Sequence, residues 1–593
     1  MKSILALLVV LMSFSLSNAQ INARLFQQPD VSDTHIAFSY GGDIWIVDKA
    51  GGLASKLSSA KGNETFPRFS PDGSQLAFSG NYDGNTDIYV IPTLGGVPMR
   101  VTHHGMSDRI MDWYPDGKHL LYTSSMESGK QRFSQFYKIP STGGLPEKLP
   151  MAYGEFASLS PDGQKVAYTD RSRIFRTWKR YRGGTAADVW LFDLNTLASE
   201  NITDNAANDE LPMWVGDKVY YLSDNGPAQR FNIWHYDLSS KTRKQITNFT
   251  EVDVHFPAAG SSEIVFEANG KLHLLDLKTE AVKTLEVQVV TDLVSVKSRK
   301  EKVEDYMQSA AIAPNGKRVV VEARGEIFSL PSEKGITKNL TQSSGVAERS
   351  PAWSPDGKYV AYWSDKSGEY ELTVRDMSAG GKEEKWTNLG AGFRYNLYWS
   401  PDSKKLAYVD QTMTIQIFDK NDKSVKKVEQ DLSLFEGALR NWQCSWSPDS
   451  RWMAYTKSMN NGNNAVMIYD TKEQKRHQAT KGFYSDSQPT FDPTGKYLYL
   501  TTNRAFRPIY SDFDNSWTYP NATQLAVIPL RKEVASPIAL KNDSVEIEEE
   551  TEDEEEKEEE QDEEEQEEEN DEAVAIDWEG FERRLVVLPP DAG

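Results

Sequence analysis

The chain has 593 residues, too many for one compact domain of roughly 100–200 residues. Its formal net charge of −22 comes almost entirely from residues 546–572, where 21 acids and one lysine leave the rest of the chain nearly neutral. This balance excludes binding to nucleic acid or anionic membranes through a basic surface, and the single cysteine, Cys444, excludes an intramolecular disulfide.

The first segment in chain order has the layout of a secretory signal peptide. Residues 1–19 contain Lys2, an apolar run and small residues before Gln20. The alternative is a membrane anchor, but the run is shorter than the roughly 20 apolar residues of a spanning helix. We therefore expect export to the periplasm or the extracellular space, cleavage after Ala19, and no membrane span.

A five-residue pattern repeats along the rest of the chain, first as "FSPDG" at residues 69–73. Proline sets the turn geometry, aspartate bonds back to nearby backbone, and glycine takes a positive φ. Strand-like segments with alternating apolar residues follow each copy. The copies are spaced by 41–47 residues, apart from one gap of 153, and their turn prolines are Pro71, Pro115, Pro161, Pro314, Pro355, Pro401, Pro448 and Pro493.

Four short strands in each repeat of about 40–45 residues predict the blade of a β-propeller. A β-sandwich array or a β-solenoid is the alternative, but these lack this repeat length or this regular turn. We expect an all-β chain with two tandem propellers: a six-bladed ring over 20–288 and a seven-bladed ring from 289 to 545, incomplete at its C-terminus. Residues 546–572 are expected to form a disordered acidic insertion, with calcium or partner binding as the alternative, and 573–593 to begin a further, truncated blade.

Sequence motifs for catalysis are absent: the chain has no G-x-S-x-G, H-E-x-x-H or P-loop pattern. We therefore predict no catalytic residue, no metal site and no cofactor. Two long blade loops carry cations, which would suit an anionic ligand; the alternative is a solvated loop or a loop whose cations pair across an interface. The first has Lys130 and Arg132; the second, residues 170–184, has Arg171, Arg173, Arg176, Lys179, Arg180 and Arg182.

The Ser-Pro-Asp-Gly blades resemble those of TolB-like propellers. Two rings followed by an acidic segment and "DWEGFERRLVVLP" (577–589) are similar to the N-terminal part of tricorn-type serine proteases. That family degrades short oligopeptides, and its propellers serve as channels and filters leading to a later PDZ and peptidase module.

The resemblance implies that this chain is the propeller portion of an exported serine peptidase and is inactive alone. It also implies basic side chains that hold the substrate carboxylate, for which Lys130 and Arg132 match best by position. Expected partners are oligopeptides, a peptidase module or further copies of the chain. A non-enzymatic TolB-like periplasmic scaffold is the alternative, and a prolyl-oligopeptidase-type lid fits less well because it would have one propeller.

Overall fold

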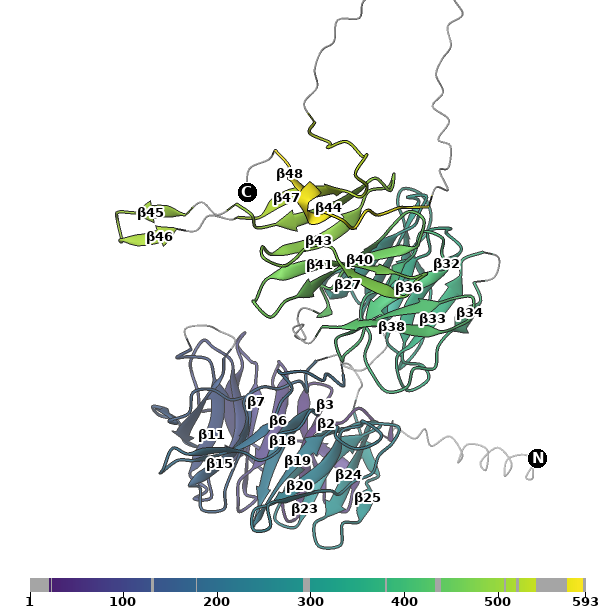
Figure 1. The fold of residues 1–593 in the computed structure, drawn as a ribbon. Helices are drawn as coiled ribbons and strands as arrows, with labels where there is room; N and C mark the ends of the chain where they lie inside the picture. The colour runs from purple at the N-terminus through teal and green to yellow at the C-terminus, as the bar shows by residue number, and fades with distance from the viewer. Residues whose placement is uncertain are drawn as a thin grey trace, which may run out of the picture. The chain divides into compact units, whose positions relative to one another are not determined.

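The computed structural model describes residues 21–22, 24–128, 133–176, 179–291, 299–378, 381–431, 439–505, 508–518, 522–539 and 573–589. The predicted signal peptide, the acidic insertion at 546–572, and both Lys130 and Arg132 lie outside these residues. The chain divides into two compact units, Met1–Lys302 and Val303–Gly593. Both are all-β, as predicted, and contain successive four-stranded antiparallel sheets (Figure 1).

The described part of the first unit contains six sheets. In chain order, their strands are β2 (Gln27–Val31), β3 (His35–Tyr40), β4 (Asp43–Asp48) and β5 (Gly52–Lys56); β6 (Glu64–Phe69), β7 (Gln75–Gly80), β8 (Asp87–Pro92) and β9 (Met99–Arg100); β10 (Asp108–Trp113), β11 (His119–Ser124), β12 (Gln135–Pro140) and β13 (Glu147–Lys148); β14 (Phe156–Leu159), β15 (Lys165–Thr169), β16 (Val189–Asp193) and β17 (Ser199–Asn201); β18 (Asp209–Val215), β19 (Lys218–Ser223), β20 (Asn232–Asp237) and β21 (Thr242–Gln245); β22 (Val254–Ala259), β23 (Glu263–Ala268), β24 (Lys271–Asp276) and β25 (Val282–Thr284). The outer edge of the first sheet is extended by β26 (Val287–Val289), which pairs in parallel with β5, and by β1 (Ile21–Asn22).

The described part of the second unit contains five four-stranded sheets and one two-stranded hairpin. Their strands are β27 (Met307–Ile312), β28 (Arg318–Ala323), β29 (Glu326–Pro331) and β30 (Lys338–Asn339); β31 (Glu348–Trp353), β32 (Tyr359–Ser364), β33 (Glu371–Asp376) and β34 (Glu383–Lys385); β35 (Tyr398–Trp399), β36 (Lys405–Val409), β37 (Thr414–Asp419) and β38 (Val425–Gln430); β39 (Cys444–Trp446), β40 (Trp452–Ser458), β41 (Asn464–Asp470) and β42 (Lys475–Gln478); β43 (Asp486–Phe491), β44 (Tyr497–Thr502), β47 (Gln524–Pro529) and β48 (Val586–Val587); and the hairpin β45 (Ile509–Ser511) with β46 (Ser516–Thr518). Two short 3-10 helices, η1 (Glu304–Tyr306) and η2 (Glu582–Arg584), complete the described elements. The predicted seven blades of this ring stay a prediction.

The repeated turn connects the first and second strands of a sheet. In the first copy, the Ser70 hydroxyl donates to Asp72 Oδ1 at 2.6 Å, and the amide of Ser74 donates to the same oxygen at 3.1 Å. Gly73 has a φ of 70°, a backbone conformation that would be strained for a residue with a side chain. These hydrogen bonds to its carboxylate, the Ser70 bond first, lower the pKa of Asp72 to about 2. The aspartate is therefore a turn former with its oxygens already engaged.

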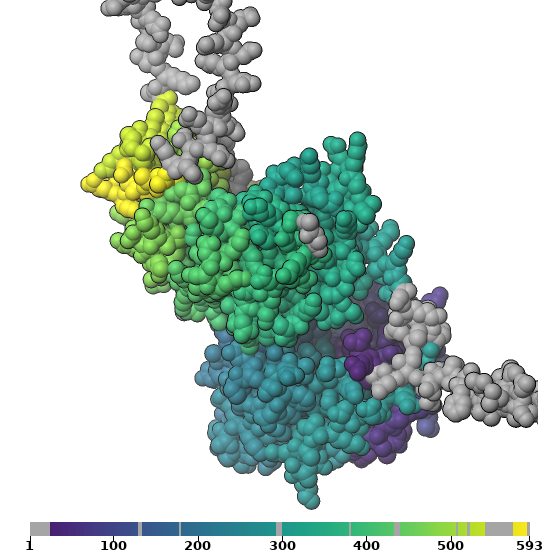
Figure 2. Space-filling model, turned by 90° about the vertical axis from the view of Figure 1, so that its right-hand side faces the viewer, coloured from purple at the N-terminus to yellow at the C-terminus, as the bar shows by residue number. Residues whose placement is uncertain are grey.

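Residues after the acidic insertion do not begin a new blade, which corrects the expectation for 573–593. The pairs Ala526↔Val587 and Val527↔Val586 add β48 to the sheet of β43, β44 and β47. The yellow C-terminal residues lie directly against the light-green residues of this sheet (Figure 2). Trp452 Nε1 donates to the carbonyl of Val574 at 2.8 Å, and Phe581 is buried in the same apolar cluster. Burial of the Val574 and Phe581 side chains therefore stabilises the packing of residues 573–589 on a sheet that the chain has already formed.

Within the described ranges, no helix is long and apolar enough to cross a membrane.

Candidate functional site

A cavity of about 800 Å³ lies at the centre of the first unit. Its wall is formed by the first strand of every sheet, namely β2, β6, β10, β14, β18 and β22. Each of these inner strands contacts the next, and β2 contacts both β6 and β22, so the six strands close a ring. The turns after the inner strands also line the cavity, including residues 70–73. The cavity therefore opens on the face of these turns, which we call the turn face.

Bulges aim side chains toward the axis of this ring. Four inner strands contain a proline, and the residue before it takes a positive φ; these residues are Gln28, Phe66, Leu211 and Phe256, at 49°, 55°, 53° and 44°. The register of each strand against its neighbour shifts at the same place. A bulge locally bends a strand and re-aims its side chain.

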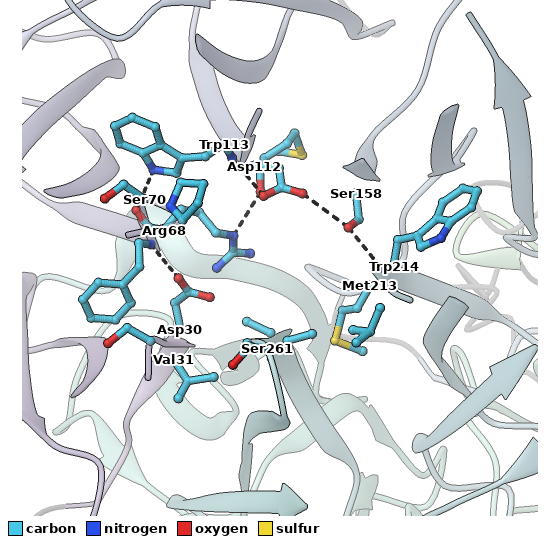
Figure 3. Close-up of a pocket in the computed structure, with 18 of the residues that line it drawn as sticks. Asp30, Val31, Arg68, Ser70, Asp112, Trp113, Ser158, Met213, Trp214 and Ser261 are labelled. Carbon is cyan, nitrogen blue, oxygen red and sulfur yellow. Dashed lines mark hydrogen bonds between the residues drawn. The ribbon is translucent and has the colours of Figure 1, made fainter. Parts of the chain in front are cut away.

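Three charged side chains form a polar belt within the cavity. The Arg68 guanidinium points into the cavity with the carboxylates of Asp30 and Asp112 on either side (Figure 3). Arg68 is held by its Nε, which donates to the carbonyl of Met111 at 3.0 Å. Asp30 accepts the amide of Phe69 at 2.7 Å, and Asp112 accepts the amide of Leu159 at 3.2 Å. The belt therefore also joins neighbouring sheets.

Burial governs the titration of both carboxyl groups. Desolvation raises the pKa of Asp30 to about 7, although the nearby Arg68 charge opposes the rise. Desolvation likewise raises the pKa of Asp112, opposed by its backbone hydrogen bond from Leu159 and then by Arg68. Near neutral pH, the charge of the belt therefore depends on pH.

Serine hydroxyls on the cavity wall are engaged in structural bonds. Ser158 Oγ donates to Asp112 Oδ2 at 3.3 Å and accepts the amide of Trp214 at 3.1 Å. Ser70 Oγ is bonded within its turn. The described lining includes no histidine that could take a proton from either hydroxyl. This arrangement suits binding rather than nucleophilic catalysis.

Four phenylalanine rings meet on the side of the cavity away from the turn face. Phe66, Phe156 and Phe256 come from β6, β14 and β22, and Phe175 comes from the loop between β15 and β16. The centroid of Phe175 lies 6.0, 5.9 and 6.1 Å from the centroids of Phe66, Phe156 and Phe256. We call the three strand-borne rings the phenylalanine floor.

Two cations of the basic loop form ion pairs with other blades, in line with the alternative of a loop that pairs across an interface. Arg180 donates two hydrogen bonds to Asp253, and Arg182 donates to Asp224 at 3.0 Å. These two arginines therefore connect the described part of the loop to the fifth and sixth blades. Lys130 and Arg132 lie outside the described residues, so their predicted role in binding stays a prediction.

Sequence reasoning missed the polar belt and the phenylalanine floor. A signal for the floor is present, because Phe-Pro occurs at 66–67 and again at 256–257, inside segments that otherwise alternate like strands. Proline within a strand marks an edge or a bulge. No comparable signal distinguishes Phe175 within its basic loop.

Metal ligation has no structural support in the part of the chain that is described, because no group of three or more His, Cys, Asp or Glu side chains is placed to hold an ion.

Comparisons with known proteins agree with this architecture. The family model of the tricorn protease N-terminal β-propeller domain matches residues 23–281, and that of the tricorn protease second β-propeller domain matches residues 307–593. The tricorn protease homolog of Saccharolobus solfataricus is 25% identical over 493 residues, covering 82% of this chain and 44% of that protein. The tricorn protease of Thermoplasma acidophilum is 24% identical over 546 residues, covering 88% of this chain and 49% of that protein.

Among solved structures, a crystal structure of the tricorn protease is 20% identical, with a TM-score of 0.46, and covers 96% of this chain and 53% of that chain. The chain spans about half the length of the curated relatives that it matches. Both matching family models describe propeller domains, and together they account for nearly all residues after 22. The chain therefore belongs to the tricorn protease family and carries the two propeller domains of that family.

Proposed function

We propose that this chain is the propeller portion of an exported tricorn-like serine peptidase that degrades short oligopeptides. The family match supports the assignment to a peptidase, and the axial cavity of the first propeller supports a role in receiving peptides. The cavity is concave and combines apolar wall residues with converging polar groups that could orient a ligand.

The polar belt supplies groups that recognise peptides. Arg68 offers donors to a peptide carbonyl or carboxylate, and the oxygens of Asp30 and Asp112 accept from amides or an amino group. Apolar wall residues such as Met213 and Trp214 would contact peptide side chains. Because only the inner strands of a closed ring surround the cavity, an extended chain fits while a folded domain is excluded.

We therefore expect the purified chain to bind peptides without hydrolysing them. Fluorescein-labelled oligopeptides are titrated into the purified protein, and their fluorescence anisotropy is measured alongside hydrolysis of fluorogenic peptides. We expect saturable binding without hydrolysis. The variant Arg68→Gln should weaken peptide binding several-fold. Arg176→Ala changes an exposed residue on the face opposite the turn face and should leave peptide binding unchanged. Absence of saturable binding would count against the proposed function, as would hydrolysis by protein free of contaminating protease.

Export and assembly need separate measurements. Expression of the full sequence in a Gram-negative bacterium should yield mature protein in the periplasm or medium, with Gln20 as the N-terminal residue on sequencing. The proposed partners are a peptidase module or further copies of this chain. Light scattering coupled to size-exclusion chromatography would distinguish self-association from a monomer that requires a separate module.

A further inference from the structure

The phenylalanine floor lies at the end of the axial cavity away from the turn face, where Phe156 lines the cavity. Its three rings come from the second, fourth and sixth sheets, which alternate around the ring. The Phe66 centroid lies 6.1 Å from that of Phe156 and 5.9 Å from that of Phe256. Aromatic rings with centroids 4.5–7 Å apart are in contact. Side chains from sheets placed a third of a turn apart can meet at such distances only near the axis.

Phe175 contacts every ring of the floor, although it belongs to a loop. Its side chain is half exposed, whereas Phe66 and Phe156 are buried. The loop therefore places one ring over the floor from the face opposite the turn face. The side of the Phe175 ring that faces away from the floor remains open to solvent, as expected for a plug at the end of a channel.

Hydrogen bonds hold the chain on the N-terminal side of Phe175. The buried carboxylate of Glu210 accepts the Ser172 hydroxyl at 2.7 Å and the amides of Arg173 and Ile174 at 2.7 and 3.2 Å. Glu210 lies on β18, so these bonds join the loop to the rigid wall of the ring. On the C-terminal side, Arg180 is paired with Asp253, the residue immediately before β22 of the sixth sheet.

Arg109 reinforces the cluster from the third sheet. Its guanidinium lies 4.6 Å from the ring centroid of Phe156 and 5.3 Å from that of Phe175. Its charge is balanced by Glu155, with Nη2 and Oε2 3.0 Å apart. A cation over aromatic faces is attracted by the ring electrons, more strongly when it is shielded from water.

We propose that Phe175 is a plug that makes the axial cavity of the first propeller a blind well rather than a through passage. A peptide then enters and leaves this propeller from the turn face alone. The end of the peptide rests on an apolar floor with the polar belt just above it, since Arg68 follows Phe66 by two residues, or roughly 7 Å of strand. The well therefore favours peptides with an apolar or aromatic terminal residue. This inference rests on the proposed function only in taking a peptide as the ligand.

The plug itself is tested without any peptide. Phe175→p-benzoylphenylalanine places a photoreactive analogue at the same position, and irradiation followed by mass spectrometry locates the crosslink. We expect crosslinks to the floor strands β6, β14 and β22. Crosslinks confined to the loop's own residues, or no intramolecular crosslink, would overturn the proposal because the ring would not occupy its seat in solution.

The blind well is tested with peptides that carry a benzophenone at one end. A tetrapeptide, an octapeptide and a dodecapeptide are crosslinked to the wild-type chain and to Phe175→Ala. In the wild type, the crosslink should stay on the well lining, such as Phe156 and Leu211, at every length. In the variant, the longer peptides should also label residues 172–176 beyond the floor.

Controls separate the two proposals. Phe175→Leu retains bulk and should behave like the wild type, and Arg176→Ala tests the same loop without touching the floor. Thermal unfolding confirms that each variant is folded. Labelling of residues 172–176 by long peptides in the wild type would overturn the blind well while leaving peptide binding intact. Failure of every peptide to label the cavity would instead contradict the proposed function, and the peptide-free crosslink would still decide whether Phe175 is a plug.

Discussion

Arg180 and Asp253, 73 residues apart in sequence, form a buried bidentate ion pair within the first propeller, with hydrogen bonds of 2.8 and 3.0 Å. The side chain of Arg180 is 0% exposed and that of Asp253 is 6% exposed. Burial alone would raise the pKa of Asp253, but the charge and hydrogen bonds of Arg180, the nearby Lys179 charge and the amide of Phe231 together hold the pKa below its usual value. The pair thus ties the loop that carries Phe175 to the residue immediately before β22.

Breaking this pair should be costly. Arg180→Met removes the bidentate partner of a buried carboxylate and leaves only Lys179, 3.9 Å away, so it should lower the free energy of unfolding of the first propeller by about 3–5 kcal/mol. Urea denaturation monitored by tryptophan fluorescence measures the change. The double variant Arg180→Met with Asp253→Asn should recover a large part of the loss, because no buried charge remains. Equal loss in the single and double variants would show that packing, not charge, dominates.

Glu210→Gln should loosen the chain next to Phe175. The carboxylate offers two acceptor oxygens to three donors, whereas an amide offers one oxygen and places an NH₂ group against backbone donors. We expect faster hydrogen exchange at the amides of Arg173 and Ile174, measured by mass spectrometry. Exchange in β18 itself should change little, and unchanged exchange at both amides would contradict the anchoring role.

The Asp30 carboxyl should make the stability of the first propeller depend on pH. Burial raises its folded-state pKa to about 7, above the ordinary value of 3.8. Between these values the folded state binds more protons than the unfolded state, so the unfolding free energy falls as pH rises, by up to about 1.4 kcal/mol per pH unit.

Asp30→Asn removes this titration but keeps an acceptor for the amide of Phe69. Its stability relative to the wild type should therefore increase from pH 5 to pH 8, as measured by urea unfolding at several pH values. Asp33→Asn, at the rim of the cavity, is the matched control. Parallel pH profiles for Asp30→Asn and the wild type would refute the raised pKa.

Local chemistry explains why much of the fold could be predicted. The turn at residues 70–73 depends on neighbours in sequence, so its letters predict its structure wherever they recur. The phenylalanine floor could not be predicted in the same way, since Phe66 and Phe256 meet only after the ring closes. Similarly, the pairing of Val586 with Val527 follows from tertiary burial of Phe581 and Val574, which no local pattern encodes. The sequence shows that the loop at 170–184 is rich in cations, but it does not indicate which acids on other blades those cations meet.

Inner-strand tryptophans link neighbouring blades. Trp113 Nε1 donates to the carbonyl of Arg68 at 2.9 Å, and its ring is buried. Trp113→Phe should lower the free energy of unfolding by about 1–3 kcal/mol, because a buried carbonyl loses its donor. Trp214→Phe is a useful control because its indole bonds within its own turn, to Gly216. Equal losses for the two variants in urea unfolding would argue against a special contribution from the bond between blades.

Residues 573–589 should contribute to the stability of the second propeller and not to that of the first. Phe581 is 4% exposed within the apolar cluster that joins the fourth and fifth sheets of that unit. Phe581→Ala should lower its unfolding free energy by about 3–5 kcal/mol. Calorimetry should show the loss in one transition only, and Glu579→Ala, at an exposed position on the same segment, should cost far less. A shift of both transitions would be inconsistent with this local role.

The position of the acid-rich stretch has a consequence for synthesis of the chain. β47 ends at Pro529 and its partner β48 begins at Val586, with the acidic residues between them. At about 5–20 residues per second, a ribosome needs roughly 3–11 s to cover this interval, during which the outer edge of β47 lacks its partner. Unpaired edges recruit neighbouring strands. The polyanion emerges during this interval, and its repulsion should keep nascent chains on one polysome from pairing with each other before β48 arrives.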